Sequence, residues 1–453
     1  MIAAPGLRPP SPRGLPLVGN LLDWGRDPFA ASTRWAEVHG DIVEMRTPGP
    51  GAYLLFAPRL VQELLVQRAA DFRKTPLTRG MSCVIGDSVV TLSHEPWSAR
   101  RRLLNPALRK QALRHHARVM VEHAQAYAAR WRSGEPFDLH QEMLDYMFDV
   151  LVDVLTTGLG GDDRARLRRG FEVFWDDFSS LEFAVLSLLF DGEPYRRLRT
   201  PRRRRQLAQL ADFDRIVAGL ATHSRAHPGE DLLSALTHSW DAQQTHDERQ
   251  LREDLTTLVL AAQETTATGL SLTLDLLMRH PGVLTALRAE LAPLGDEPLE
   301  VEALARLPLL DAVVREGLRL QPPIMGVARE ATCSTEIGGY PIAAGTQVVA
   351  SAWVIQRSHR WWGDDAREFR PQRWLEGRER ARFAWFPFGA GPHVCIGMSF
   401  ALIEMALAIA TWVRLLDLVP LGPPPTLSAK LTTRPRDPLL VRASAPTASR
   451  PAR

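Results

Sequence analysis

The segment Phe388-Gly389-Ala390-Gly391-Pro392-His393-Val394-Cys395-Ile396-Gly397 places one cysteine in a glycine-rich loop directly before a predicted helix. Its glycines permit positive φ angles, so backbone N–H groups can turn toward the sulfur of Cys395. The helix that follows would direct its positive end at the same atom. Both effects favour the thiolate over the thiol.

A thiolate held in this way is suited to bind a metal. Coordination deprotonates a thiol outright, and a thiolate ligand on haem iron favours cleavage of the O–O bond. The alternative is a buried structural cysteine beside a turn, which is the commoner role of a lone cysteine. The composition of these ten residues favours the metal ligand.

The loop resembles the cysteine-ligand loop of the cytochromes P-450, whose pattern is Phe-x-x-Gly-x-x-x-Cys-x-Gly. Phe388, Gly391, Cys395 and Gly397 fill its fixed positions, and the resemblance extends from near Pro16 to residues 434–436. It implies a haem-thiolate monooxygenase of the soluble bacterial type, with haem b as cofactor and Cys395 as iron ligand. It also implies a mainly α fold with a small β-rich portion in a single domain.

Length and composition fit one soluble globular unit. The chain has 453 residues, of which 45% are hydrophobic and 24% charged. That is ordinary globular usage. We expect a proline-rich N-terminal segment at 1–16, the monooxygenase domain at 17–442 and a disordered tail at 443–453.

Net charge and cysteine content limit which partners and which cellular compartment we expect. A net charge of +3 argues against a nucleic-acid-binding protein. The three cysteines, Cys83, Cys333 and Cys395, are too scattered for a disulfide framework, which fits the reducing cytoplasm. The sequence shows no signal pattern and no apolar run of about 18 residues. We therefore expect a cytoplasmic monomer without a membrane anchor.

Local signals predict a small sheet followed by helices. Asp27-Pro28 is a helix start and Gly40 a helix stop, and strand patterns follow at 41–46 and 52–56. Strand character returns at 336–340 and 347–350, joined around Gly345. The longest helical pattern covers 247–279, which would span about 50 Å at ~1.5 Å per residue.

The middle of that helix reads Ala261-Ala262-Gln263-Glu264-Thr265-Thr266. An acid and an alcohol are unusual in a buried helix, because a buried carboxylate needs a partner and threonine lowers helix propensity. Taken alone, the pattern favours a threonine bonded to the i−4 carbonyl and a glutamate that faces solvent.

Beside the haem loop, the same stretch resembles the family's oxygen-activation motif, in which Glu264 and Thr265 take the acid and alcohol positions. The resemblance implies that they deliver protons to iron-bound oxygen. Ala262 departs from the pattern, because glycine is more usual there. The groove for dioxygen is then tighter, which bears on efficiency more than on reaction type.

Glu316 and Arg319 share a helix face at i,i+3 spacing, and most such pairs are solvated and weak. The family joins its Glu-x-x-Arg pair to a third arginine, for which Arg373 is the match. The resemblance implies a structural network that fixes the scaffold of the haem loop, so that its loss would reduce haem incorporation.

The two haem propionates need cationic or hydrogen-bonding partners when buried. Trp97 and Arg101 match the family's Trp-x-x-x-Arg, and Arg329 matches the arginine before the late hairpin. His393 stands where arginine is commoner, and we expect it to make propionate binding partly dependent on pH. Phe388 completes the predicted cofactor-binding residues.

From Trp97 to Val121 the sequence has no acidic residue and accumulates Arg100, Arg102, Arg109, Lys110 and Arg114. One interpretation is a solvated face. The other is a dock for an acidic redox protein, because in this family that helix borders the cysteine side of the haem.

The resemblance thus implies insertion of one oxygen atom from O2 into an apolar small molecule, such as a terpenoid or a fatty acid, by hydroxylation or epoxidation. The sequence shows no flavin or iron–sulfur module, so electrons are expected from a ferredoxin or flavodoxin with its NAD(P)H reductase. The alternatives are a peroxide-dependent peroxygenase and a non-catalytic haem sensor or binding protein.

Overall fold

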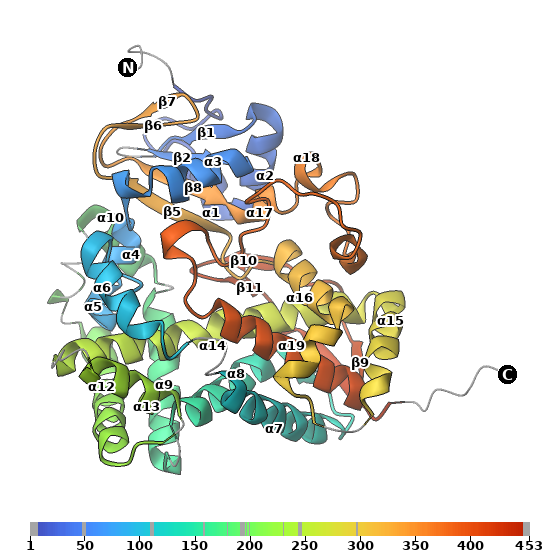
Figure 1. Cartoon of the computed structure of the whole chain (residues 1–453). Coiled ribbons are helices and arrows are strands. Elements are labelled where there is room, and N and C mark those ends of the chain that lie inside the picture. Colours follow the sequence, from blue (N-terminus) through green and yellow to red (C-terminus); the bar gives the residue numbers. More distant parts are fainter. Residues whose placement is uncertain are drawn as a thin grey trace.

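A large body of helices carries a smaller β-rich region at one end in the computed structural model (Figure 1). The structure describes residues 8–446 except 48–50, 109–112, 157–158, 179, 191–194, 196, 199, 230, 243–246 and 296–297. The helices are α1 (Leu21–Arg26), α2 (Pro28–His39), α3 (Pro58–Gln62), α4 (Pro76–Gly80), α5 (Ser82–Ile85), α6 (His94–Leu104), α7 (Leu113–Trp131), α8 (Leu139–Leu155), α9 (Gly161–Phe178), α10 (Leu181–Phe190), α12 (Pro201–Ala226), α13 (Leu232–Ala242), α14 (Glu248–Met278), α15 (Pro281–Leu291), α16 (Pro308–Leu320), α17 (Ala352–Ile355), α18 (His359–Trp362) and α19 (Met398–Leu415). Short 3-10 or π turns are η1 (Glu63–Gln67), η2 (Ala69–Asp71), η3 (Ala292–Leu294), η4 (Val301–Arg306), η5 (Pro371–Trp374) and η6 (Gly391–His393).

The largest sheet combines strands from the N-terminal part of the chain with strands from its later part. The strands are β1 (Ile42–Met45), β2 (Ala52–Leu55), β3 (Phe72–Arg73), β4 (Phe137–Asp138), β5 (Gly326–Ala331), β6 (Thr335–Ile337), β7 (Tyr340–Ile342), β8 (Gln347–Ser351), β9 (Asp417–Pro420), β10 (Leu427–Ala429), β11 (Thr433–Pro435) and β12 (Leu440–Ser444). The largest sheet has the order β1-β2-β8-β5-β3, in which β2 and β8 pair in parallel with Ala52 opposite Gln347. The smaller sheets are β4-β12-β9, β10-β11 and β6-β7.

Helix α14 forms the centre of the helical body. Its N-cap Asp247 accepts a hydrogen bond from the Gln250 N–H at 3.1 Å, and the helix ends before His280-Pro281, as predicted. It packs against α8, α12, α16 and α19, so most of its side chains are buried. In Figure 1 it crosses the helical body beneath α19.

Helix α19 follows the cysteine loop and is apolar over its whole length. Among the described helices it alone is long and apolar enough to cross a membrane by length and composition, and 67% of that stretch is buried inside the protein. Packing against α7, α14, α15 and α16 accounts for its apolar character.

Two sequence predictions need correction. The segment predicted as one strand at 336–340 is a hairpin, because Gly338 and Gly339 adopt positive φ angles of 61° and 84° and reverse the chain between β6 and β7. Strand β12 continues to Ser444, where it pairs with β9, so order extends into the predicted disordered tail. Residues 1–7 and 447–453 lie outside the described part. The mainly α fold with a small β-rich portion is confirmed.

Candidate functional site

The cysteine loop lies between Phe386 and the start of α19. Gly389 and Gly391 have φ angles of 74° and 69°. A Cβ on Gly391 would lie 1.9 Å from the Leu65 carbonyl oxygen, so only glycine fits there. The Cys395 N–H donates to the Phe388 carbonyl at 2.9 Å, which closes the loop and fixes the cysteine just before the helix.

The sulfur of Cys395 has accessible surface only because it opens on a cavity; protein atoms otherwise surround it. Burial raises the pKa of the Cys395 thiol, while the Gly397 N–H and the Arg101 guanidinium act in the opposite direction. The backbone hydrogen bond thus favours the thiolate as predicted, but burial outweighs it. Ionisation needs a cation on the sulfur, and metal coordination provides one.

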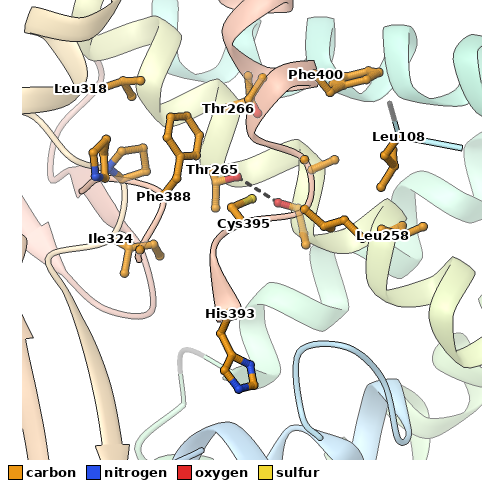
Figure 2. Close-up of a pocket in the computed structure, with 18 of the residues that line it drawn as sticks. Leu108, Leu258, Thr265, Thr266, Leu318, Ile324, Phe388, His393, Cys395 and Phe400 are labelled. Carbon is orange, nitrogen blue, oxygen red and sulfur yellow. Dashed lines mark hydrogen bonds between the residues drawn. The ribbon is translucent and has the colours of Figure 1, made fainter. Parts of the chain in front are cut away.

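The cavity has a volume of about 340 Å³ and lies between α14, α19, β5 and the cysteine loop (Figure 2). Its lining is mostly apolar and includes Leu258, Ile324, Val327, Phe388 and Phe400. Thr265 and Cys395 border this same cavity. A flat apolar group with a metal at its centre fits such a lining, in which Cys395 offers a thiol as ligand.

A cluster of basic side chains borders the cavity. Lys74, Arg329 and His393 line it, and Arg101 donates to the Val394 carbonyl at its edge. Among the described residues no carboxylate forms an ion pair with Lys74, Arg101 or Arg329, and the cavity lining contains no acidic residue. Buried cations without anions indicate a site for a ligand that carries negative charge. The residues therefore fit haem, which has two carboxylates on an apolar ring.

The pKa values of this cluster are lowered, mainly because the side chains are buried. Burial, with help from Arg329 and Arg101, lowers the pKa of Lys74 to about 7. Burial alone lowers the pKa of Arg329 to about 10. Burial and the neighbouring cations lower the pKa of His393 to about 3, so its imidazole is neutral near pH 7 in the protein alone. The pH dependence of propionate binding predicted for His393 stays a prediction, because it depends on how far bound carboxylates would change this pKa.

Trp97 and Arg101 on α6 contact the cysteine loop instead of lining the cavity. The Trp97 ring contacts His393 in a tilted arrangement with 3.8 Å between centroids, and Arg101 lies over Trp97 at 5.6 Å. Nδ1 of His393 is buried without a hydrogen-bond partner. Sequence reasoning missed Lys74, which belongs to no motif. Its only signal is that it is one of three lysines in a chain rich in arginine.

Thr265 and Glu264 are adjacent in sequence but about 100° apart around α14. Thr265 lines the cavity, and its hydroxyl donates to the Ala261 carbonyl at 2.9 Å (Figure 2). The predicted bond to the i−4 carbonyl is therefore present, and it does not prevent Thr265 from lining the cavity. Glu264 is absent from the cavity lining.

Glu264 is 1% exposed and lies against the hairpin β10–β11, so the expectation of a solvent-facing glutamate is wrong. The Thr432 hydroxyl donates to its Oε1 at 3.0 Å, and Arg434 forms an ion pair with the same oxygen. Burial raises the pKa of Glu264, although Arg434 and Thr432 lower it.

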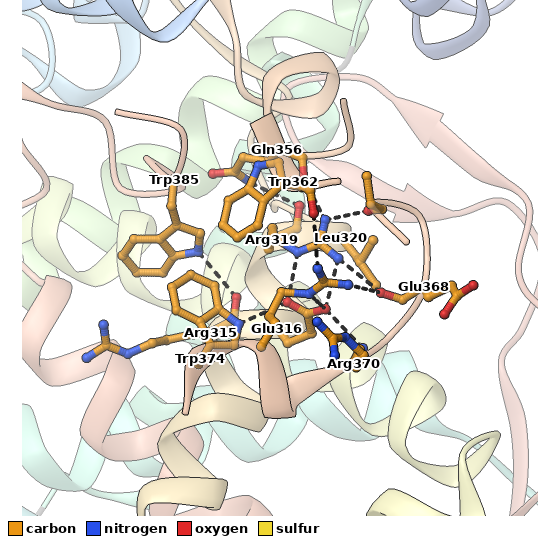
Figure 3. A network of polar contacts seen from close by, with 12 residues as sticks. Arg315, Glu316, Arg319, Leu320, Gln356, Trp362, Glu368, Arg370, Trp374 and Trp385 are labelled. Atoms are coloured by element: carbon orange, nitrogen blue, oxygen red, sulfur yellow. Dashed lines mark hydrogen bonds and ion pairs between the residues drawn. The ribbon is translucent and has the colours of Figure 1, made fainter. Parts of the chain in front are cut away.

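Glu316 forms ion pairs with Arg319 and Arg373, as predicted. Figure 3 shows this network, with Glu316 and Arg319 labelled. Both guanidinium groups bond to the carboxylate at 2.8 Å, and Arg319 is fully buried. Burial would raise the pKa of Glu316, but the bonds and charges of Arg319 and Arg373 hold it below its usual value. Arg319 also donates to the Gln356 carbonyl, and the Gln356 side chain accepts from the Phe386 N–H at 2.8 Å. The network therefore reaches the start of the cysteine loop.

Arg100 does not belong to the predicted docking face, because its side chain is not on the surface. Arg100 is buried between α6 and α14, where it bonds to Asp254 at 2.9 Å and to Glu253 at 3.5 Å. Arg102 is exposed. Arg109, Lys110 and the side chain of Arg114 lie outside the described residues.

Comparison with known proteins gives a consistent result. The family model described as Cytochrome P450 matches residues 9–441. The chain is 30% identical to cyclooctatin synthase and to cyclooctat-9-en-7-ol 5-monooxygenase of Streptomyces melanosporofaciens, and each match covers 88% of this chain and 87% of the relative. It is 29% identical to pentalenene oxygenase of Streptomyces avermitilis, over 88% of this chain and 89% of the relative.

The match covers the cysteine loop and α14, which line the cavity, and also the buried network of Glu316, Arg319 and Arg373. Two of these relatives are named as a monooxygenase and an oxygenase. The chain belongs to the cytochrome P450 family, whose members are oxidoreductases that contain haem b.

Proposed function

We propose that this protein inserts one oxygen atom of O2 into a terpenoid-like apolar molecule, using electrons from a separate ferredoxin or flavodoxin. The observation that carries the proposal is the apolar cavity that Cys395 and Thr265 share. Two relatives support the substrate class, because their names refer to cyclooctat-9-en-7-ol and pentalenene.

Cys395 would hold the haem iron, and Lys74, Arg101, Arg329, His393 and Trp97 would hold the propionates. When bound, haem supplies dioxygen binding and O–O cleavage, which the thiolate favours. The cations would be neutralised by the two carboxylates, so binding relieves the repulsion among them. Phe388 would pack against the ring from the cysteine loop.

Thr265 would orient water and dioxygen in the cavity through its hydroxyl. Glu264 would bring protons from the hairpin side of α14, where Arg434 has 26% of its side chain exposed. Because burial raises the pKa of Glu264, the carboxyl can take up a proton closer to neutral pH than a solvated glutamate. Glu264 must leave Arg434 to reach the cavity, since it does not line it.

The test is turnover of a terpene panel by the haem-loaded protein with ferredoxin, its reductase and NADPH. We expect a product that has gained one oxygen from isotopically labelled dioxygen. Thr265→Ala should lower product per NADPH about tenfold or more and release hydrogen peroxide. The reason is that proton transfer by a positioned side chain typically raises the reaction rate by about 10²-fold or more.

The matched control is Thr268→Ala on the same helix, which is buried outside the cavity lining and should keep the coupling of the wild type. Product formed with peroxide but never with NADPH would favour the peroxygenase. Good haem loading without any product would favour a haem-binding protein.

A second prediction concerns Arg434. Arg434→Met removes the charge that lowers the pKa of Glu264, so burial acts unopposed except by Thr432, and the carboxyl protonates at higher pH. The acidic limb of the pH profile of product per NADPH should therefore move to higher pH. Arg434→Lys, which keeps the charge, should restore the profile.

His140 on α8 is another titratable group near Arg434. Burial and Arg434 lower its pKa to about 4, so it is neutral near pH 7 in the wild type, and burial, the larger cause, still acts on it in Arg434→Met. An acidic limb that stays in place in Arg434→Met would contradict the role of Glu264.

A further inference from the structure

The exposed large aliphatic side chains of the described residues are concentrated near the N-terminus. Five of them fall within eight residues, which we call the N-terminal apolar turn (residues 15–22). They are Leu15, Leu17, Val18, Leu21 and Leu22. Leu17 is 94% exposed, more than any other large hydrophobic residue described. A contiguous group of this kind on a soluble protein marks a contact surface.

The turn is a firmly held structure. The backbones of Leu15 and Gly19 bond to each other in both directions at 2.9 Å. A Cβ on Gly19 would lie 2.2 Å from the Arg46 carbonyl oxygen, so the turn is seated directly on the end of β1. The Asn20 N–H also donates to this carbonyl at 2.9 Å.

The backbone is strained at Leu17, which lies at the apex of the turn. Its φ angle is 68°, in the left-handed region that branched residues rarely adopt. Strain of this kind persists where the surrounding structure imposes it, and it marks functional positions. Helix α1 continues the turn with no fully buried residue, so Leu21 and Leu22 add to the same exposed stretch.

Positive charge surrounds the turn. Arg13, Arg26 and Arg46 are exposed and form no ion pair within the part of the chain that the structure describes. The nearby acids are engaged: Asp23 pairs with Arg34, and Glu44 with Arg8. Asp27 accepts a hydrogen bond from the Ala30 N–H at the start of α2.

We propose that the N-terminal apolar turn binds the surface of an anionic lipid bilayer. The leucines would enter the boundary between headgroups and acyl chains, and Arg13, Arg26 and Arg46 would meet the phosphates. A protruding apex with a nearly fully exposed leucine fits a fluid layer better than the flat, extensive face that a second copy of this chain would need. The proposal does not depend on the substrate of the enzyme.

The test is flotation of the full-length holoprotein with vesicles of phosphatidylcholine, with and without phosphatidylglycerol. We expect the protein to float with the anionic vesicles. Leu17→Asp/Leu22→Asp should reduce the bound fraction about tenfold or more, because two inserted apolar groups are replaced by charges. Arg13→Gln/Arg46→Gln should weaken binding to anionic vesicles about fivefold for each arginine.

The matched control is Leu375→Asp/Leu440→Asp, which adds the same charge elsewhere: Leu375 is 49% exposed, as is Leu22. This control should float like the wild type, and all variants should keep the haem spectrum and melting temperature. Wild-type protein that stays with the unbound fraction, or an equal loss in the control, overturns the proposal. So does self-association in solution that Leu17→Asp/Leu22→Asp abolishes while no vesicle binding is seen.

Discussion

Replacing Cys395 with serine is expected to abolish the haem-thiolate spectrum and reduce product formation to background. Cys395 is the one sulfur that the loop presents to the cavity, and serine offers a hydroxyl that stays protonated where the thiol would ionise on a metal. Haem that remains bound would then lack the ligand that favours O–O cleavage. The measurement is the absorption spectrum of the reduced, carbon monoxide-bound protein, in which a thiolate ligand moves the main band far to longer wavelength.

The control for this substitution is Cys333→Ser, since Cys333 is exposed and far from the loop in sequence. It should leave the spectrum and turnover unchanged. A wild-type spectrum in Cys395→Ser would remove the basis for assigning this cavity to the haem. A loss of all haem in Cys395→Ser, with the long-wavelength band retained in Cys333→Ser, would agree with the assignment.

The sequence predicts features that depend on neighbours along the chain. The helix that starts at Asp27-Pro28 needs only a cap and a proline, and the structure has it at 28–39. The loop around Cys395 is likewise local, because Gly389 and Gly391 adopt the positive φ angles that glycine permits. Arg373 was found because the family motif identified a partner for Glu316 that spacing alone would not reveal.

Features that depend on distant partners could not be predicted. Arg100 belongs to a run of basic residues, but its role is set by Asp254 on α14, more than a hundred residues away in sequence. Glu264 was correctly recognised as unusual, yet its partners Thr432 and Arg434 come from a hairpin near the end of the chain. Lys74 has no local pattern at all, and only the fold brings it to the cationic edge of the cavity.

The second large effect is expected at Glu316. Glu316→Gln leaves Arg319 and Arg373 with side chains 0% and 4% exposed and without their shared carboxylate. Removing one partner of a buried ion pair costs about 3–5 kcal/mol, a large part of the ~5–15 kcal/mol that stabilises a typical domain. We therefore expect a lower melting temperature and less haem per protein, because the network reaches Phe386 through Gln356.

The matched control is Glu376→Gln, whose pair with Arg370 at 2.6 Å has side chains 30% and 34% exposed. A pair so open to solvent contributes about 1 kcal/mol or less. The pKa of Glu316 lies below its usual value of 4.5, so its contribution is complete above that pH and is lost as pH falls through the lower value. The stability of Glu316→Gln should lack this acid-dependent loss. Equal melting temperatures for Glu316→Gln and Glu376→Gln would show that the carboxylate does not hold the loop's scaffold together, and haem loading would then have to depend on the cavity edge alone.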